Sequence, residues 1–111
     1  MDRRELISQV ITQLELTLQQ RKQADPNTSY TATLLHKGTD TILKKLAEET
    51  AELILAAKNN NQQNIIHETA DLLYHIQVLL TQQNIPIEDI YKELQRREGI
   101  SGLTEKENRK K

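Results

Sequence analysis

One short acidic segment occurs twice in this chain of 111 residues. The copies are Glu49–Ile54 and Glu68–Leu73, and they flank the run Asn59–Asn61. Each copy carries two acidic residues three positions apart, within an apolar pattern that is typical of a helix. Asparagine is favoured in turns, so we predict that the chain reverses direction near Asn60. The two copies then lie side by side on antiparallel helices.

Such a reversal brings four carboxylates to one level, because residues equally far from Asn60 face each other. Glu49 is therefore expected opposite Asp71. By the same symmetry Glu52 is expected opposite Glu68. Like charges at that range repel unless a cation neutralises them, and an all-oxygen cluster suits Mg²⁺ or Mn²⁺. Acidic pairs also occur on solvated helix faces, but the symmetric placement and the position of Glu49 in the apolar stripe favour a metal site acting on a polyanion.

Composition predicts a single helical domain over residues 1–111. Apolar residues make up 36% of the chain, Phe and Trp are absent, and only three glycines and two prolines interrupt the sequence. The core must therefore consist of aliphatic side chains packed between helices. We predict an all-α fold, a MazG-like helical bundle built on a central antiparallel hairpin at about residues 39–83.

Charge and hydropathy argue against several classes of partner. The formal net charge is −1 and only 3% of residues are aromatic, so nothing in bulk attracts nucleic acid or an anionic membrane. No apolar run approaches the ~18 residues of a membrane span. The absence of cysteine fits a reducing compartment. We expect a cytoplasmic protein that binds neither nucleic acid nor membrane.

Apolar periodicity and turn residues divide the chain into five expected helices. They cover residues 3–23, 30–37, 39–58, 62–83 and 86–97. Thr28 or Ser29 is expected to cap the second helix. Thr39 or Asp40 is expected to cap the third. Residues 99–111 are polar, and their composition predicts an irregular tail.

Basic and histidine side chains near the acidic segments each have two interpretations. Lys44 and Lys45 either pair with acidic residues one turn later or clamp a phosphate oxygen, and Lys45 is the better phosphate candidate. His75 is either a helix histidine satisfied by a neighbouring carboxylate, or a donor to phosphate or a partner that orients Asp71. Zinc would prefer His or Cys ligands, and the Glu-x-x-His signature of di-iron bundles is missing.

These motifs resemble the phosphoribosyl-ATP pyrophosphatase family over roughly residues 29–109. The matching residues are Ser29-Tyr30-Thr31-Ala32, Gly38, Lys44-Lys45-x-x-Glu48-Glu49-x-x-Glu52, Glu68 to His75, Val78-Leu79-Leu80, Arg96-Arg97, Ser101-Gly102, Glu105-Lys106 and Arg109. The acidic motifs alone indicate only the wider superfamily of all-α nucleotide pyrophosphohydrolases, which includes MazG-type and dimeric dUTPase enzymes. One departure is Ala47, where the family often has Gly.

The resemblance implies Mg²⁺-dependent hydrolysis of phosphoribosyl-ATP to phosphoribosyl-AMP and pyrophosphate, the second step of histidine biosynthesis. It implies that one or more Mg²⁺ ions, replaceable by Mn²⁺, are held by Glu49, Glu52, Glu68 and Asp71. Glu48 neighbours the cluster without facing the core, so it is the expected residue that orients or deprotonates the attacking water. A stand-alone enzyme and a homodimer or larger homo-oligomer are also implied.

The family match gives roles to further basic residues. Lys45 and Arg97 are expected to add positive charge beside the phosphates, and the tail that carries Lys106 is expected to act as a flap over the site. Two other interpretations stay open. One is a housecleaning enzyme that hydrolyses other nucleoside triphosphates with the same acidic core, and the other is a helical dimerisation module without enzymatic activity.

Overall fold

The structure is a computed structural model that describes residues 1–110, apart from the side chains of Glu105 and Lys110. The described residues form helices and no strand, as the sequence predicts. The helices are α1 (Arg3–Arg21), α2 (Tyr30–Lys37), α3 (Thr39–Lys58), α4 (Gln62–Gln82), α5 (Ile87–Arg97) and α6 (Gly102–Lys110). No helix within residues 1–110 combines the length and the apolar character that crossing a membrane requires.

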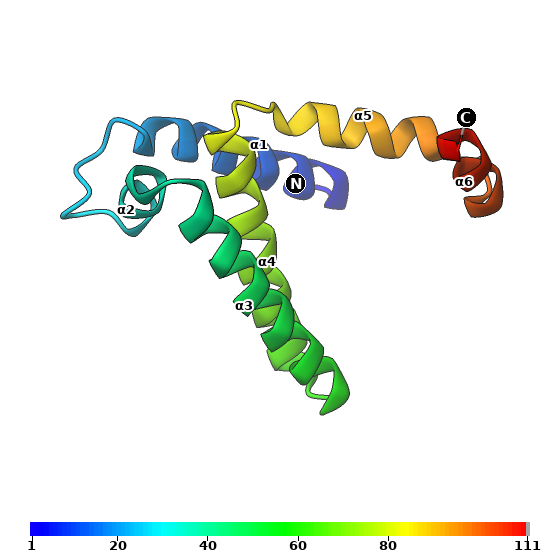
Figure 1. The fold of residues 1–111 in the computed structure, drawn as a ribbon, viewed down its shortest axis with the longest axis horizontal. Helices are drawn as coiled ribbons and strands as arrows, with labels where there is room; N and C mark the ends of the chain where they lie inside the picture. The colour runs from blue at the N-terminus through cyan, green and yellow to red at the C-terminus, as the bar shows by residue number, and fades with distance from the viewer. Residues whose placement is uncertain (111) are drawn as a thin grey trace.

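Helices α3 and α4 form the predicted antiparallel hairpin and pack along each other more extensively than any other pair (Figure 1). The turn falls where the sequence places it. Asn60 has a left-handed backbone (φ 54°), a conformation that asparagine tolerates better than most residues. The side chain of Asn61 then caps α4 by accepting a hydrogen bond from the Asn64 N–H, 3.1 Å away. Turn and cap together fix the register of the two acidic segments.

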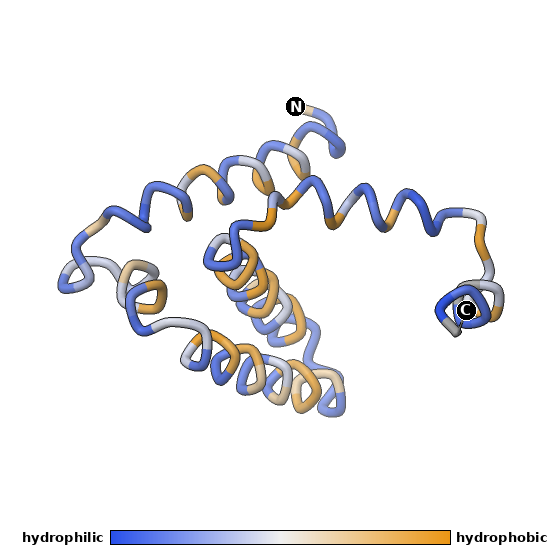
Figure 2. The backbone as a smooth tube through the Cα atoms, turned by 45° about the horizontal axis from the view of Figure 1, so that its top comes forward, coloured by the Kyte–Doolittle hydropathy of each residue, from blue (hydrophilic) through white to orange (hydrophobic). Residues whose placement is uncertain are grey.

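The core lies where α1 and α2 pack against one end of the hairpin. Its buried residues come from α1 to α4 and are Leu18, Leu34, Ile42 and Val78. Full burial of a side chain of this size contributes roughly 1.5–3 kcal/mol. Figure 2 shows apolar positions recurring along α3 and α4 as far as their turn. The core therefore anchors one end of the hairpin, while the other end extends away from α1 and α5 (Figure 1).

One residue, Gly38, separates α2 from α3. Ser29 caps α2 as predicted, by accepting a hydrogen bond from the Ala32 N–H. The prediction that Thr39 or Asp40 caps α3 is wrong, because Gly38 occupies the cap position and no side chain caps this helix. The Gly38 N–H donates to the Leu34 carbonyl and its own carbonyl accepts from the Ile42 N–H. Gly38 thus ends one helix and starts the next, which leaves no position for a capping side chain.

The C-terminal region differs from the predicted irregular tail. Helix α5 starts after Pro86, and its first N–H, that of Ile87, donates to the Glu15 carboxylate of α1 at 2.7 Å. After a break at Gly99 the chain forms α6, so the expectation of an irregular segment is wrong for residues 102–110. The Ser101 hydroxyl accepts a hydrogen bond from the Thr104 N–H and starts this helix. Local capping outweighs the polar composition.

Candidate metal centre

The hairpin brings acidic side chains from both of its helices together. Glu49 and Glu52 of α3 and Glu68 of α4 each offer an oxygen, and these oxygens lie within 4.8 Å of one another. A second group consists of His67, Glu68 and Asp71, again with ligand atoms within 4.8 Å. Glu68 belongs to both groups. The acidic residues therefore form two overlapping sets rather than one level of four.

The structure contains one of the two predicted carboxylate pairings. Glu52 and Glu68 lie close across the hairpin, as the symmetry about Asn60 predicts. The structure does not group Glu49 with Asp71, whose Oδ2 instead lies 3.4 Å from the His67 Nε2 one turn earlier on the same helix. A partner on its own helix therefore competes with the partner across the hairpin. Sequence reasoning missed His67, although its four-residue spacing from Asp71 was a readable signal.

Glu49 is the most buried of these carboxylates. Only 6% of the residue is exposed, which confirms that it points to the core side of α3. Its Oε2 has no hydrogen-bond partner, and neither has the Oε2 of Glu68, although both atoms are shielded from solvent. A shielded carboxylate oxygen without a partner is costly in free energy. Two such oxygens from opposite helices are the donor type that Mg²⁺ or Mn²⁺ binds.

Electrostatic strain concentrates on Glu68. A side-chain hydrogen bond with Glu52 raises the pKa of Glu68 above its usual range, and burial and the charges of Glu52 and Asp71 act in the same direction. A hydrogen bond between two carboxyl groups requires a shared proton, because two ionised carboxylates offer only acceptors. Without a cation the cluster therefore favours holding a proton, and a bound metal ion would take over that neutralising role.

Lys45 supplies a positive charge at one edge of the cluster. Its Nζ lies 3.7 Å from Oε1 of Glu49 and 3.7 Å from Oε2 of Glu48. The structure thus contains the predicted pairing along the helix, and a role for Lys45 on phosphate stays a prediction. Lys44 is exposed beside it. Glu48 is about half exposed, at the rim of the cluster and not in the core.

His75 does not have the carboxylate partner that one interpretation gave it. The residue is buried, its Nδ1 lies 2.8 Å from the backbone carbonyl oxygen of Asp71, and its Nε2 lies 3.0 Å from the Tyr30 hydroxyl. Both ring nitrogens are therefore engaged by protein groups, which argues against direct contact with a phosphate. His75 does touch Asp71, through the backbone of that residue. Sequence reasoning missed Tyr30 as its partner, because no helical periodicity links α2 to α4.

The basic residues of the C-terminal region lie apart from the cluster within one chain. Helix α5 packs against α1, and Figures 1 and 2 both show α5 and α6 turned away from the hairpin. Arg97 forms an ion pair with Glu93 at 3.1 Å, and Lys106 is exposed on α6. The structure therefore does not bring Arg97 and Lys106 to the acidic cluster of their own hairpin. The matching residue Glu105 has its side chain outside the described part of the structure.

A helical hairpin whose two arms share unpartnered carboxylate oxygens defines a class: all-α proteins with a candidate carboxylate metal centre. Comparison with known proteins narrows that class. Residues 11–98 match the family model for phosphoribosyl-ATP pyrophosphohydrolase. The chain belongs to this family.

Several relatives carry the name phosphoribosyl-ATP pyrophosphatase. The one from Nitrosospira multiformis is 50% identical over 101 residues, which cover 91% of this chain and 84% of the relative. The one from Dechloromonas aromatica is 50% identical over 100 residues, which cover 90% of this chain and 93% of the relative. A relative from Neisseria meningitidis is 47% identical over 97 residues, which cover 87% of this chain and 91% of the relative. These relatives thus match over nearly their whole length.

Proposed function

We propose that this chain hydrolyses phosphoribosyl-ATP to phosphoribosyl-AMP and pyrophosphate, as a cytoplasmic enzyme of histidine biosynthesis. The observation that carries the proposal is the pair of shielded, unpartnered oxygens of Glu49 and Glu68 on opposite arms of the hairpin. Family membership supplies the substrate, since the relatives are named for it. The carboxylates supply the site at which a triphosphate with its metal would bind.

Mg²⁺ is the proposed ion, and Mn²⁺ is its expected substitute. Glu49, Glu52 and Glu68 would hold it, with Asp71 joining from α4. When bound, the ion neutralises charge on the phosphates and lowers the pKa of a coordinated water. Glu48 is about half exposed at the rim of the cluster, where its carboxylate would orient a water or accept its proton. In the metal-free chain the same carboxylate balances Lys45.

Lys45 is the proposed contact to a phosphate oxygen, with Lys44 adding charge from the exposed side of α3. His75 contributes indirectly, through its hydrogen bonds to the Tyr30 hydroxyl and to the backbone carbonyl of Asp71. Arg97 and Lys106 belong to α5 and α6, which turn away from the hairpin (Figure 1), so we assign them to the site of a second copy. A tail that closes over a neighbouring subunit's substrate also gives the separate helix α6 a role.

The shape of the single chain supports a homodimer or larger homo-oligomer. Its accessible surface is 8436 Å², about 2,100 Å² more than the roughly 6,300 Å² of a folded monomer of this mass. Its radius of gyration is 16.3 Å against about 13 Å for a compact domain of this length. Stable interfaces bury about 800 Å² or more per partner, so the excess is large enough to supply one.

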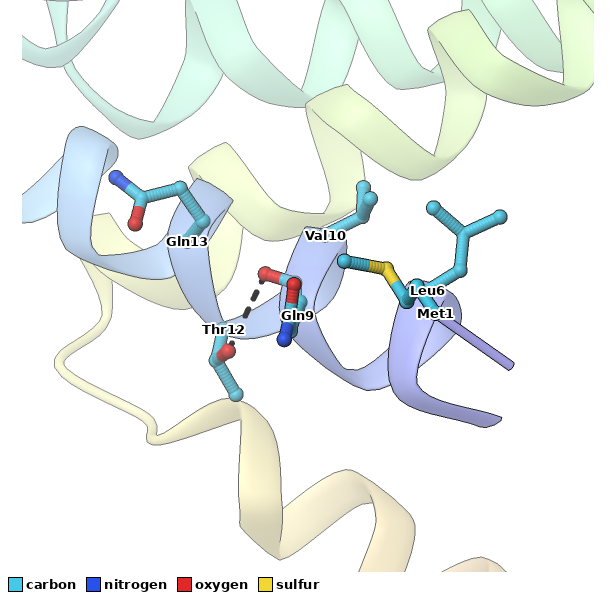
Figure 3. A pocket seen from close by; sticks show the side chains of 6 residues that line it. All are labelled: Met1, Leu6, Gln9, Val10, Thr12 and Gln13. Carbon is cyan, nitrogen blue, oxygen red and sulfur yellow. Dashed lines mark hydrogen bonds between the residues drawn. The ribbon is translucent and has the colours of Figure 1, made fainter. Parts of the chain in front are cut away.

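Exposed apolar side chains at and just before α1 also support an oligomer. Figure 3 shows Met1, which precedes α1, and Leu6 and Val10 of α1 among the residues that line a pocket of about 520 Å³. A groove between α1 and α5, of about 430 Å³, is lined by Ile7, Ile87 and their neighbours. Neither cavity borders the acidic cluster, so both suit subunit contacts better than substrate.

The decisive experiment is turnover of authentic phosphoribosyl-ATP with Mg²⁺, set beside a panel of common and modified nucleoside triphosphates. We expect release of pyrophosphate from phosphoribosyl-ATP at a kcat/KM well above that for any other substrate, and none in excess chelator. Preference for another triphosphate would favour a housecleaning enzyme. Full activity in chelator would overturn the metal centre. No turnover of any triphosphate would leave the helical dimerisation module.

A further inference from the structure

The two carboxylate oxygens of Glu49 have different surroundings. Its Oε1 lies 3.7 Å from Nζ of Lys45, one turn earlier on α3, whereas its Oε2 is shielded from solvent and has no hydrogen-bond partner. The Glu49 side chain is only 7% exposed, and it is one of the three carboxylates whose oxygens converge at the cluster. In this structure a lysine from the same helix therefore balances the charge of a buried carboxylate.

Lys45 pairs with a second carboxylate at the same time. Its Nζ also lies 3.7 Å from Oε2 of Glu48, whose side chain is 45% exposed. The two carboxylates have different proposed tasks, since Glu49 would bind the ion and Glu48 would orient or deprotonate the water. One ammonium thus occupies a metal ligand and the expected base together. That ammonium would also repel a divalent cation at the cluster, more strongly at this partly buried site than in bulk water.

The Lys45 side chain is able to leave these two partners. It is 32% exposed, and both of its carboxylate contacts are longer than a hydrogen bond. A lysine ammonium sits on a flexible four-carbon stem, so it can turn toward a new acceptor without any movement of the helix. The phosphate oxygens of a nucleotide are strong acceptors of charge-assisted hydrogen bonds. A bound triphosphate therefore offers Lys45 an alternative to Glu48 and Glu49.

We propose that Lys45 competes with the metal ion for Glu49 until a substrate phosphate draws its ammonium away. Its departure frees a metal ligand and the water-orienting carboxylate in one step. Lys45 therefore weakens binding of the ion alone and favours binding of the ion together with phosphate. The inference rests on the proposed function of the cluster, and it gives this lysine a task before substrate arrives.

The test is titration of the substrate-free protein with Mn²⁺ in about 0.1 M salt, followed by electron paramagnetic resonance. Lys45→Met keeps a long side chain and removes the charge, so it should bind Mn²⁺ about fivefold more tightly than wild type, the upper end for loss of an exposed ion pair. Lys45→Arg keeps the charge and should bind Mn²⁺ as wild type does. The KM for phosphoribosyl-ATP should move the other way and rise in Lys45→Met, because the phosphate contact is lost.

Lys44→Met is the matched control, because it removes the same charge one residue away. Lys44 is exposed, and the described side chains give it no ion pair. Salt screens the longer-range effect of an exposed charge, so this variant should bind Mn²⁺ almost as wild type does. Methionine and lysine have similar helix propensities, so neither substitution should disturb α3.

Mn²⁺ binding that is no tighter in Lys45→Met than in wild type would overturn the competition. Equal tightening in Lys44→Met would overturn it too, since loss of any nearby positive charge would then be sufficient. Absence of Mn²⁺ binding in every variant would overturn the metal centre as well. If Lys45→Met binds Mn²⁺ more tightly but wild type does not turn over phosphoribosyl-ATP, the competition is supported and the proposed substrate is wrong.

Discussion

Glu68 is the residue on which the candidate site and the stability of the chain conflict. Its carboxylate lies beside that of Glu52, which raises the pKa of Glu68, and its shielded Oε2 has no hydrogen-bond partner. Replacing it with Gln keeps the shape, but removes one charge from a crowded cluster. In chelator Glu68→Gln should therefore melt at a higher temperature than wild type, as followed by circular dichroism.

The same substitution should damage function. Loss of an outer-shell partner already costs 10- to 100-fold in metal-site activity, so loss of a ligand charge should lower turnover by about a hundredfold or more. The stabilisation that Mg²⁺ gives wild type should also shrink, because a ligand stabilises the folded state only as far as it binds. A variant with normal turnover, or one that melts lower in chelator, would contradict this account of Glu68.

Glu93 gives a pH dependence of known sign. Ion-pair hydrogen bonds from Arg96 and Arg97 hold the pKa of Glu93 at about 2, below its usual 4.5. A depressed pKa contributes stability above pH 4.5, and that contribution is lost as pH falls from 4.5 toward 2. Wild type should therefore melt slightly above Glu93→Gln at pH 7, and the difference should vanish near pH 2.

Salt provides the control for this small effect. The pairs at the end of α5 are exposed, so 1 M salt should shrink the difference in melting temperature at pH 7. A difference that is independent of both salt and pH would mean that Glu93 acts through packing and not through charge.

At the scale of single residues, sequence predicts what depends on position along one helix. The burial of Glu49 follows from its place in the apolar stripe, and the closeness of Glu52 and Glu68 follows from symmetry about the turn. The contact between Tyr30 and His75 depends on how α2 crosses α4, which no local pattern encodes. The contact between His67 and Asp71 is different, because its four-residue spacing along α4 is a local signal that sequence reasoning overlooked.

Among the elements, the junction of α2 and α3 most restricts which amino acid can occupy a position. Gly38 has φ 95° and ψ −170°, a backbone conformation essentially restricted to glycine. Space is not the obstacle, since a Cβ at this position would meet no atom within 4 Å. Gly38→Ala should therefore destabilise the fold by about 1–3 kcal/mol through backbone strain. Chemical denaturation would measure the change.

Gly102→Ala is the matched control for that strain. Gly102 begins α6 and has no positive φ, and a Cβ at this position would likewise meet no atom within 4 Å. Alanine favours helix over glycine, so this variant should be neutral or slightly more stable. Equal loss from both substitutions would show that the positive φ of Gly38 is not the cause.

Element boundaries were predictable wherever a single signal dominated. Helices α2 and α4 lie within a residue of their predicted bounds, 30–37 and 62–83, since a capping side chain precedes each of them. The start of α3 was predicted with the wrong cap because one glycine serves two helices. Helix α6 was missed because turn-forming residues in its first turn hid a short capped helix.

On the scale of the whole molecule, the outer face of the hairpin carries apolar side chains that the proposed second copy would cover. Ile66 and Leu73 of α4 are 57% and 56% exposed, and they lie on the side of that helix away from the buried His75 and Val78. Seven residues apart, they form one stripe. Sequence predicts the apolar character of this stripe, but only the placement of the neighbouring helices shows that the chain itself leaves it uncovered.

We expect the double variant Ile66→Lys and Leu73→Lys to dissociate the oligomer while helicity is retained, because two charges would be buried at the contact. Sedimentation equilibrium would give the mass. Leu103→Lys, at a residue 79% exposed on α6, is the comparison: it should leave the mass unchanged if the contact lies on the hairpin, and should lower it if α6 also carries the contact. If Arg97 and Lys106 act on a second copy, the dissociated variant should also lose turnover, and that loss should ease at protein concentrations that restore the oligomer. A monomeric wild type with full activity would contradict both the contact and the shared site.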